Sequence, residues 1–531
     1  MVKFSKLFVK SKLITFIAVF VATTIPLNTA FSEQIYKVRF GEQGFSSFFQ
    51  VGHKSFRYTE RGFNSYYGAN LNLTPCAKAS DSDCIDSLSY KSRNSNEWLK
   101  SELDTAWTFP VNGVPLVGSA KGSSEQFVIK NKFPTLADPI NNYPAGGATS
   151  IWKTPQSKGT ANFRLFLNIN LTGTNPDQSS EVIKWNQIIA QAIPISMNGS
   201  ISSDGTPGGK IEDTFGEITS IKVRLRVNIL KQILNGWVHS RTVNPEIVYG
   251  NSTATGEYVD ITGDPLSVPT AEARMNGEQY LSIYENPYMK NRFKGFPVKL
   301  PDPKVLWGTW GSTDGIEQGE LKMWSAYEPF IAKEAVSLSS MWKLVGAGNL
   351  NLQSFNSSEC ISSGKIDGIL ATNATQYSPT PPIYLESSQE LSYQLAAPHF
   401  KSSNEEFKGS YSLVVSEKLA KCIWGNSPTN ASARISILNS EGSSSVVTQS
   451  LKQQTGFYYF NINGFGFSAP TIRIKLTQDA LATAPTPSAT PTIAAAKPAS
   501  SKKVITCAKG KVTKKVTGTN PKCPSGYKRV A

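Results

Sequence analysis

Alternating apolar and polar residues mark several segments of the chain as β-strands. The clearest segment spans residues 221–229 (IKVRLRVNI), in which every second residue is Ile, Val or Leu and the residues between them are Lys, Arg or Asn. Such a period of two places one set of side chains in a core and the other in water. Residues Phe163–Leu171 (FRLFLNINL) show a similar pattern in a mixed register. The pattern predicts a protein built mainly from β-structure.

Four short strand-like runs follow one another near the C-terminal end of the apolar part of the chain. They are Ala433–Gly442, Ser445–Leu451, Gly456–Gly464 and Ser468–Leu476, with glycine and proline between them. This spacing is typical of an antiparallel sandwich or meander. Helical patterns are few, and the best lies in Glu320–Leu344, which Pro329 interrupts. We expect one or two short helices there.

Shifts in composition divide the chain into five parts. Residues 1–32 read as a signal peptide, 33–348 as a large β-rich, sandwich-like region, and 349–476 as a second, smaller β-sandwich domain. Residues 477–501 are rich in Ala, Pro and Thr, cannot bury a core, and are expected to form a disordered linker. Residues 502–531 form a small basic module with two cysteines. The predicted fold class is therefore mainly β.

The N-terminal segment carries the features of a secretory signal. Four lysines precede the apolar run Leu13–Ala22, which is too short to span a bilayer comfortably. Small residues at Ala30 and Ser32 favour cleavage before Glu33, and an uncleaved N-terminal anchor is the alternative. No second long apolar run follows, so no membrane span is expected after cleavage.

The positive charge of the chain is concentrated at its two ends. The whole chain has a formal net charge of +15, of which the first 32 residues contribute four lysines and no acids. From Thr477 onward there are ten Lys or Arg residues and one Asp, a net +9, which leaves +2 for Glu33–Leu476. A nearly neutral body is thus followed by a strongly basic C-terminal module.

Six cysteines in an exported chain are expected to form three disulfides. Proximity favours Cys76–Cys84 and Cys507–Cys523, which leaves Cys360–Cys422 by elimination. No CxxC pair is present, which argues against zinc and thioredoxin-type sites. A disulfide across the C-terminal module would hold a two-stranded hairpin that is too small to build a core of its own.

The basic module is the strongest candidate binding site in the sequence. Its cationic side chains are Lys502, Lys503, Lys509, Lys511, Lys514, Lys515, Lys522, Lys528 and Arg529. Lysines are compact, hydrated point charges that suit diffuse polyanions better than bidentate recognition. Anionic cell-wall or surface polymer is the expected partner. Nucleic acid is a weaker one, because Tyr527 is the only aromatic residue available for stacking on bases.

Sequence motifs for enzymatic chemistry are sparse. The one enzyme hypothesis rests on Asp314, Glu317 and Glu320, which lie among Trp307, Trp310 and Trp324. Paired carboxylates near aromatic platforms are typical of glycosidases, although surface acids near a turn explain this spacing better. Trp307 and Trp310 are the best candidates for an exposed glycan platform that could bind polysaccharide.

No cofactor is expected. His53, His239 and His399 are far apart and have no metal-binding spacing. Asp81, Asp83 and Asp86, in the loop DSDCID, could bind calcium through a short acidic loop, but the loop lacks the glycine and terminal glutamate of an EF-hand. A solvated disulfide loop explains these acids better.

Several stretches of the chain resemble uncharacterised exported proteins of actinobacteria, particularly of freshwater lineages. The tail Cys507–Tyr527 is similar to a short basic module that ends many of those proteins. The other similar stretches are Pro144–Trp152, Ala371–Pro382, Leu391–Phe400, Lys421–Gly425 and Gly464–Leu476. The resemblance implies an extracellular or cell-wall-associated location and transfers no catalytic residues. Together with the charge distribution, it predicts a non-enzymatic binding or structural protein of the envelope; a secreted carbohydrate-active hydrolase with a wall-targeting tail is the alternative.

Overall fold

The computed structural model divides the chain into two compact units, a body that ends at Gln478 and a C-terminal module that follows it. It describes residues 34–41, 53–58, 66–104, 114–117, 126–130, 144, 150–154, 163–175, 183–200, 207–292, 294, 306–307, 319–347, 360, 364–378, 381–425, 431–438, 444–445, 449–467, 471–478, 503–510, 512–518 and 521–530. The predicted signal peptide and most of the predicted linker lie outside these residues. Among the described residues, no helix has the length and apolar character needed to cross a membrane.

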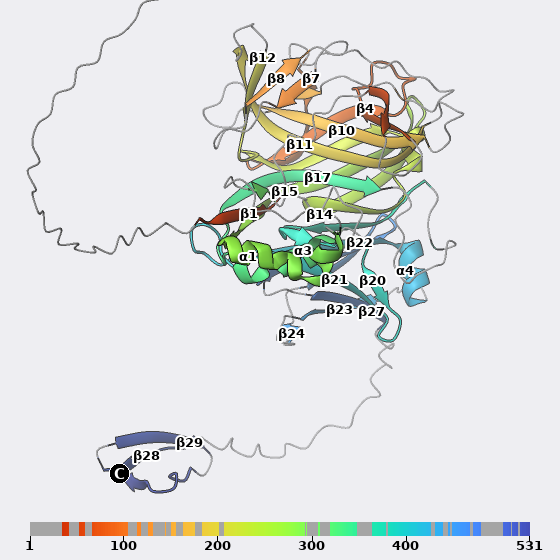
Figure 1. Ribbon diagram of the computed structural model, residues 1–531. Coiled ribbons are helices and arrows are strands. Elements are labelled where there is room, and N and C mark those ends of the chain that lie inside the picture. Colours follow the sequence, from red (N-terminus) through yellow and green to blue (C-terminus); the bar gives the residue numbers. More distant parts are fainter. Residues whose placement is uncertain are drawn as a thin grey trace, which may run out of the picture. The chain divides into compact units, whose positions relative to one another are not determined.

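One long sheet runs through the body (Figure 1). Its strands, in spatial order, are β3 (Tyr66–Asn72), β10 (Phe163–Asn175), β11 (Lys184–Ser200), β17 (Ser337–Ala347), β14 (Gly236–Ser252), β18 (Ile366–Thr372), β22 (Gly409–Ser416), β26 (Phe457–Phe465) and β25 (Gln449–Gln454). Neighbours are antiparallel, except that β18 runs parallel to β14. Short strands extend the β3–β11 end: β2 (His53–Tyr58), β6 (Glu102–Leu103), β7 (Val114–Val117), β8 (Gln126–Lys130), β9 (Ile151–Lys153) and β12 (Pro207–Ile211).

A second sheet packs against the first and shares a strand with it. It runs in the order β5 (Ser95–Lys100), β4 (Cys84–Ser92), β13 (Ile218–Arg226), β15 (Gly256–Met275) and the C-terminal half of β14. The alternation that the sequence predicts for β13 is confirmed: Ile221, Val223 and Leu225 are fully buried in the core between the sheets. β13 ends at Arg226, and the predicted strand tail instead becomes a short 3₁₀ helix, Ile229–Gln232.

Three of the four strand-like runs near residue 476 are confirmed as the strands β23 (Ala431–Leu438), β26 and β27 (Thr471–Gln478). The described ends of the run Ser445–Leu451 belong to two separate strands, β24 (Ser444–Ser445) and β25. The runs are shared between two sheets. β25 and β26 belong to the long sheet, whereas β23 and β27 belong to a smaller one. The rest of the smaller sheet is β19 (Gln376–Tyr377), β20 (Ile383–Leu385), β21 (Glu390–Ala396) and β24. Side chains of both sheets, such as Tyr393 and Ile472 from one and Leu413 and Phe460 from the other, form one apolar core. The arrangement is the predicted second, smaller β-sandwich.

The long sheet crosses the predicted domain boundary at residue 348. β18, which follows the boundary, pairs in parallel with β14, which precedes it, and Trp237 of β14 lies in the core of the second sandwich. β18 is hydrogen-bonded to β14 on one side and to β22 on the other, so it depends on strands from both sides of the predicted boundary. The two sandwiches are therefore continuous within one body.

Short helices cover the end of β15. They are α1 (Gly277–Ser282), α2 (Pro287–Arg292) and α3 (Gly319–Tyr327), with 3₁₀ turns at Ile283–Glu285 and Glu328–Phe330. They pack in a third core on β15 and β1 (Tyr36–Phe40), which also pairs with β16 (Leu306–Trp307). The one or two short helices expected within Glu320–Leu344 are found in its first part, as α3 and the 3₁₀ turn at Glu328–Phe330. Residues from Ser337 onward form β17, because the sheet buries Trp342 and Leu344 on one face.

Candidate functional site: the basic C-terminal module

The C-terminal module is a three-stranded antiparallel sheet in the order β29 (Val512–Gly518), β28 (Lys503–Lys509), β30 (Lys528–Val530). Gly510 has a φ of 62° in the turn between β28 and β29, a conformation that glycine adopts without strain. The sequence predicts only the β28–β29 hairpin. The third strand, β30, is too short to show an alternating pattern in the sequence. The structure defines it by the pairing of residues 528–530 with β28.

The interior of the module consists of very few side chains. Ile505 and Cys507 are buried on β28, and Cys507 is bonded to Cys523, with the two Cα atoms 5.7 Å apart. The other predicted pairs, Cys76–Cys84 and Cys360–Cys422, are also present. A sheet this small cannot bury enough apolar area to fold unaided, so the disulfide supplies a major part of its stability.

The cations of the module lie on both faces of the sheet. The exposed ones are Lys509, Lys514, Lys515, Lys522, Lys528 and Arg529. Cross-strand partners point to the same side of a sheet, so Lys514 and Arg529 share the face of Cys507, which pairs with both. Lys515 shares the opposite face with its partner Thr506. The charge therefore surrounds the module and is not confined to a single groove.

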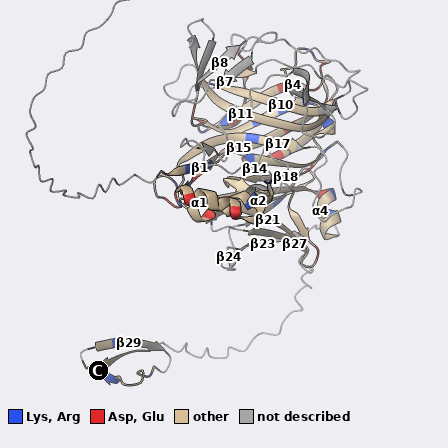
Figure 2. Ribbon diagram, viewed as in Figure 1, with Lys and Arg blue, Asp and Glu red and all other residues tan. Residues whose placement is uncertain are grey.

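No acidic residue offsets this charge within the module. The last acid in the sequence is Asp479, and Figure 2 shows Lys and Arg but no Asp or Glu on the described strands of the module, whereas both signs occur on the body. Lys514 Nζ lies 5.6 Å from the ring centroid of Tyr527, a weak interaction that leaves the ammonium group exposed. Such a surface can attract an extended polyanion without reading its detailed shape. The remaining predicted cations, Lys502 and Lys511, lie outside the described residues, as does the side chain of Lys503.

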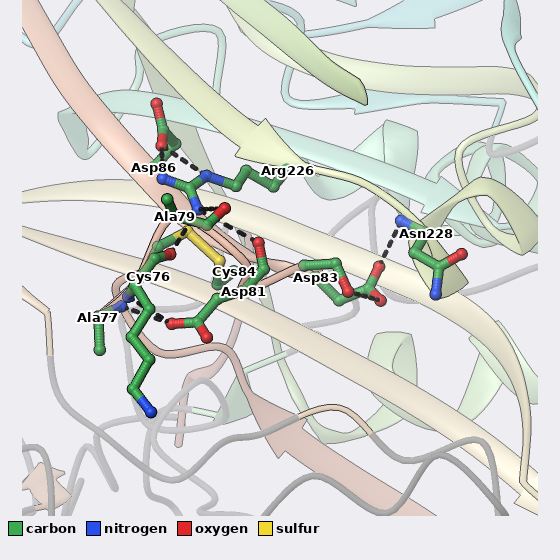
Figure 3. The surroundings of a disulfide bond; sticks show 11 residues. Cys76, Ala77, Ala79, Asp81, Asp83, Cys84, Asp86, Arg226 and Asn228 are labelled. Atoms are coloured by element: carbon green, nitrogen blue, oxygen red, sulfur yellow. Dashed lines mark hydrogen bonds and ion pairs between the residues drawn. A yellow bond between two sulfur atoms is a disulfide. The ribbon is translucent and has the colours of Figure 1, made fainter. Parts of the chain in front are cut away.

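The acidic loop beside Cys76–Cys84 does not gather its carboxylates around one point (Figure 3). Asp83 is 2% exposed and accepts hydrogen bonds from the backbone N–H groups of Asn228, Ile229 and Leu230. Asp81 accepts hydrogen bonds from two backbone N–H groups of its own loop. These acids hold the backbone together.

The third acid of the loop, Asp86, pairs with Arg226 at 2.6 Å, and the same guanidinium donates to the carbonyl oxygens of Lys78, Ala79 and Asp81. Among the described residues, no group of three metal-ligating side chains converges anywhere in the chain. The calcium alternative is therefore not supported by the positions of Asp81, Asp83 and Asp86, since each has a separate structural partner.

A pocket of about 310 Å³ adjoins this loop, lined in part by Asp81, Val227, Thr255 and Glu257. Its two acids already have partners, because Asp81 binds the loop backbone and Glu257 pairs with Lys231. The pocket thus offers no unpaired carboxylate for a ligand.

The residues behind the hydrolase alternative fall largely outside the described part of the chain. Asp314, Glu317 and Trp310 lie there entirely, and the side chains of Glu320, in α3, and Trp307, in β16, are not described. Trp324 is buried in the third core, where its ring lies 5.5 Å from that of Phe40. The glycosidase arrangement and the Trp307–Trp310 platform stay predictions.

The three histidines do not form a common site in the described structure. His239 is buried on β14, with its ring 5.4 Å from that of Tyr377, and His399 lies beside Phe400 at 6.3 Å. His53 lies on β2, which pairs with β3 near one end of the long sheet. Their separation agrees with the interpretation that each histidine makes local contacts and does not take part in a shared metal site.

The sequence analysis overlooked one group of surface residues in the body. The ring of Trp98 on β5 lies close to the ammonium groups of Lys91 and Lys222 on the outer face of the second sheet. A signal was available, because Trp98 stands in the polar stretch SNEWLKSE, where a core tryptophan is not expected.

No protein-family model matches the chain, and a search of curated proteins finds no match.

Proposed function

We propose that this chain is an exported envelope protein, held to an anionic wall or surface polymer by its C-terminal module. One observation carries the proposal: six exposed cations surround a disulfide-bonded sheet that has no acidic residue. The body, with a net charge of +2 over Glu33–Leu476, acts as a non-enzymatic binding or structural module. The predicted signal peptide and the resemblance to exported actinobacterial proteins support this location.

The physical basis of the attachment is long-range attraction between a dense cationic surface and a repeating anion. Six or more ammonium and guanidinium groups on a small sheet create a field that a phosphate-rich or carboxylate-rich polymer enters at many points. Each contact is weak by itself and is screened within about 8 Å at physiological salt. The attachment is therefore expected to be reversible and sensitive to salt.

The test is retention on purified bacterial cell walls at rising salt. Replacing Lys514, Lys515, Lys522 and Lys528 by Gln removes four charges from the module, and this module variant is expected to elute at markedly lower salt than the original chain. The matched control replaces four surface lysines of the body, the exposed Lys290, Lys333 and Lys421 and the half-buried Lys401, by Gln and so removes the same net charge. Two of these form exposed ion pairs, which contribute little to stability.

The outcomes separate attachment by the module from attraction by total charge. If the module variant elutes early and the body control does not, the module holds the wall. Equal shifts in both variants, or retention that salt does not change, would contradict the proposal. Walls stripped of their anionic polymer are expected to release the original chain as well.

A further inference from the structure

A cationic aromatic patch lies on the outer face of the second sheet. Trp98, half-buried on strand β5, has the Nζ atom of Lys222 at 4.4 Å from its ring centroid and that of Lys91 at 5.0 Å. Two ammonium groups thus approach one indole ring from two other strands, β13 and β4. Their mutual repulsion in the free protein is only partly offset by the attraction of each to the ring.

The strand register adds a third cation to the same face. Ser89 of β4 lies opposite Lys222 on one side and opposite Lys100 of β5 on the other. Cross-strand neighbours share a face, so Lys100, Ser89 and Lys222 form a row across three strands. The alternate residue Tyr90 points the other way, into the core. The side of the sheet that carries this row faces solvent, since Lys100 is exposed.

Two arginines of β13, Arg224 and Arg226, are paired with carboxylates, whereas the three lysines of the patch are not. Arg224 makes two hydrogen bonds to the carboxylate of Asp260, at 2.6 and 2.7 Å, and Arg226 pairs with Asp86. In the described part of the chain, no carboxylate lies within ion-pair distance of Lys91, Lys100 or Lys222. Exposed Glu97 is the nearest acid in sequence to Trp98, and it forms none of the ion pairs of the described residues.

Protection of a sheet edge explains only part of the patch. Lysines on an edge strand prevent unwanted pairing with other chains, and β5 pairs with β4 alone among the described strands. This reason fits Lys100. It does not fit Lys222, because β13 is paired on both sides, with β4 and β15.

We propose that Trp98, Lys91, Lys100 and Lys222 form a binding site for an acidic polysaccharide. The proposal rests on the proposed binding role of the body and names the class of ligand it takes. The indole offers a flat apolar surface to the C–H face of a sugar ring. The lysine ammonium groups, on flexible stems, move to meet carboxylate or phosphate groups on the same polymer. A flat sheet face of this kind suits an extended chain rather than an enclosed small molecule.

The experiment measures binding to the full chain in which all nine Lys and Arg residues of the module are replaced by Gln, so that the module has no cation left to bind the polymer. They are Lys502, Lys503, Lys509, Lys511, Lys514, Lys515, Lys522, Lys528 and Arg529. The probes are polygalacturonate, a phosphorylated mannan and neutral dextran, followed by isothermal titration calorimetry at low salt. We expect at least one acidic polymer to bind and dextran not to bind. Binding of polygalacturonate alone assigns the site to carboxylate polymers, and binding of the mannan alone assigns it to phosphate polymers.

Point variants in this background locate the binding. Trp98→Ala and Lys222→Gln are each expected to weaken binding about tenfold or more, equivalent to about 1.4 kcal/mol. Trp98→Phe should restore part of the affinity, because it keeps an aromatic face. The control Lys333→Gln removes an exposed charge elsewhere on the body and should change the affinity less than about twofold, as its charge is screened from the patch.

The result that overturns the proposal is unchanged affinity in Trp98→Ala and Lys222→Gln, or equal binding of dextran and the acidic polymers. Thermal unfolding of each variant checks that it is folded, and the half-exposed position of these residues makes a folding defect small. A negative result in the polysaccharide titration does not affect the proposal that the module holds the wall, because the cell-wall retention experiment compares variants with the original module. The two proposals can therefore fail independently.

Discussion

At the scale of single residues, the surroundings of a side chain decide its role more than its type does. Asp81, Asp83 and Asp86 stand within six positions of one another and looked like a set of calcium ligands. In the folded chain one binds its own loop, one is paired with Arg226, and one binds the start of the 3₁₀ helix after β13. Spacing in the sequence could bring the three acids near each other, but it could not show that distant backbone groups would bind them separately.

Asp83→Ala is expected to destabilise the body by about 2–4 kcal/mol, because three backbone N–H groups at Asn228–Leu230 lose a charged acceptor in a buried place. Urea unfolding followed by tryptophan fluorescence measures the loss. Asp83→Asn is the matched control: it keeps an acceptor oxygen and tolerates the positive φ of 53° at this position, so it should lose less than half as much. Equal losses in the two variants would show that the acceptor does not matter.

At the scale of elements, the first strand is held to the body by a buried charge as well as by backbone pairing. Arg39 on β1 lies directly opposite Glu272 on β15, and Glu272 also binds Arg274 on its own strand. Burial raises the pKa of Glu272, but hydrogen bonds from Arg39 and Arg274 and the charges of both outweigh that effect and lower it below its ordinary value. The charged form of Glu272 is thus favoured by folding.

Linkage between this pKa and folding predicts a dependence on pH. A carboxyl group whose pKa is lower in the folded state stabilises the protein above its unfolded pKa, about 4.3, and loses that effect as the pH falls through the folded value. Glu272→Gln should therefore cost about 1–2 kcal/mol at pH 7, less than a fully buried pair because Arg39 and Arg274 are 30% and 60% exposed. The difference from the original chain should shrink below pH 4. A difference that stays constant from pH 7 to pH 3 in urea unfolding would refute the linkage.

At the scale of the whole molecule, two units of very different construction share one chain. The body has apolar cores between its sheets and under its helices, whereas the module has Ile505 and a disulfide in place of a core. Stability in the first comes mainly from buried apolar area and in the second mainly from a covalent bond. The units should therefore unfold independently.

Replacing Cys507 and Cys523 together by Ser tests this independence. Loss of a disulfide that spans 16 residues should cost the module about 3 kcal/mol, enough to unfold a sheet with so small a core. Amide hydrogen exchange of residues 503–530 should then become fast, while the thermal midpoint of the body stays within about 1 °C. The same double replacement at Cys76 and Cys84 serves as the control and should lower the midpoint of the body instead. Retained protection in the module would contradict this account.

Local patterns were enough to predict the mainly β fold class, the strand at Ile221, the smaller sandwich and the basic, cysteine-paired end. These features depend on alternation, composition and cysteine spacing, all of which are local properties of a chain. Tertiary structure alone decided that β18 continues the long sheet past residue 348, that Ser337–Leu344 is strand, and that β30 completes the module. It also decided which cations remain unpaired beside Trp98, because their partners come from strands far apart in the sequence. Pairing between distant segments depends on the whole set of contacts in the folded chain, which no single segment encodes.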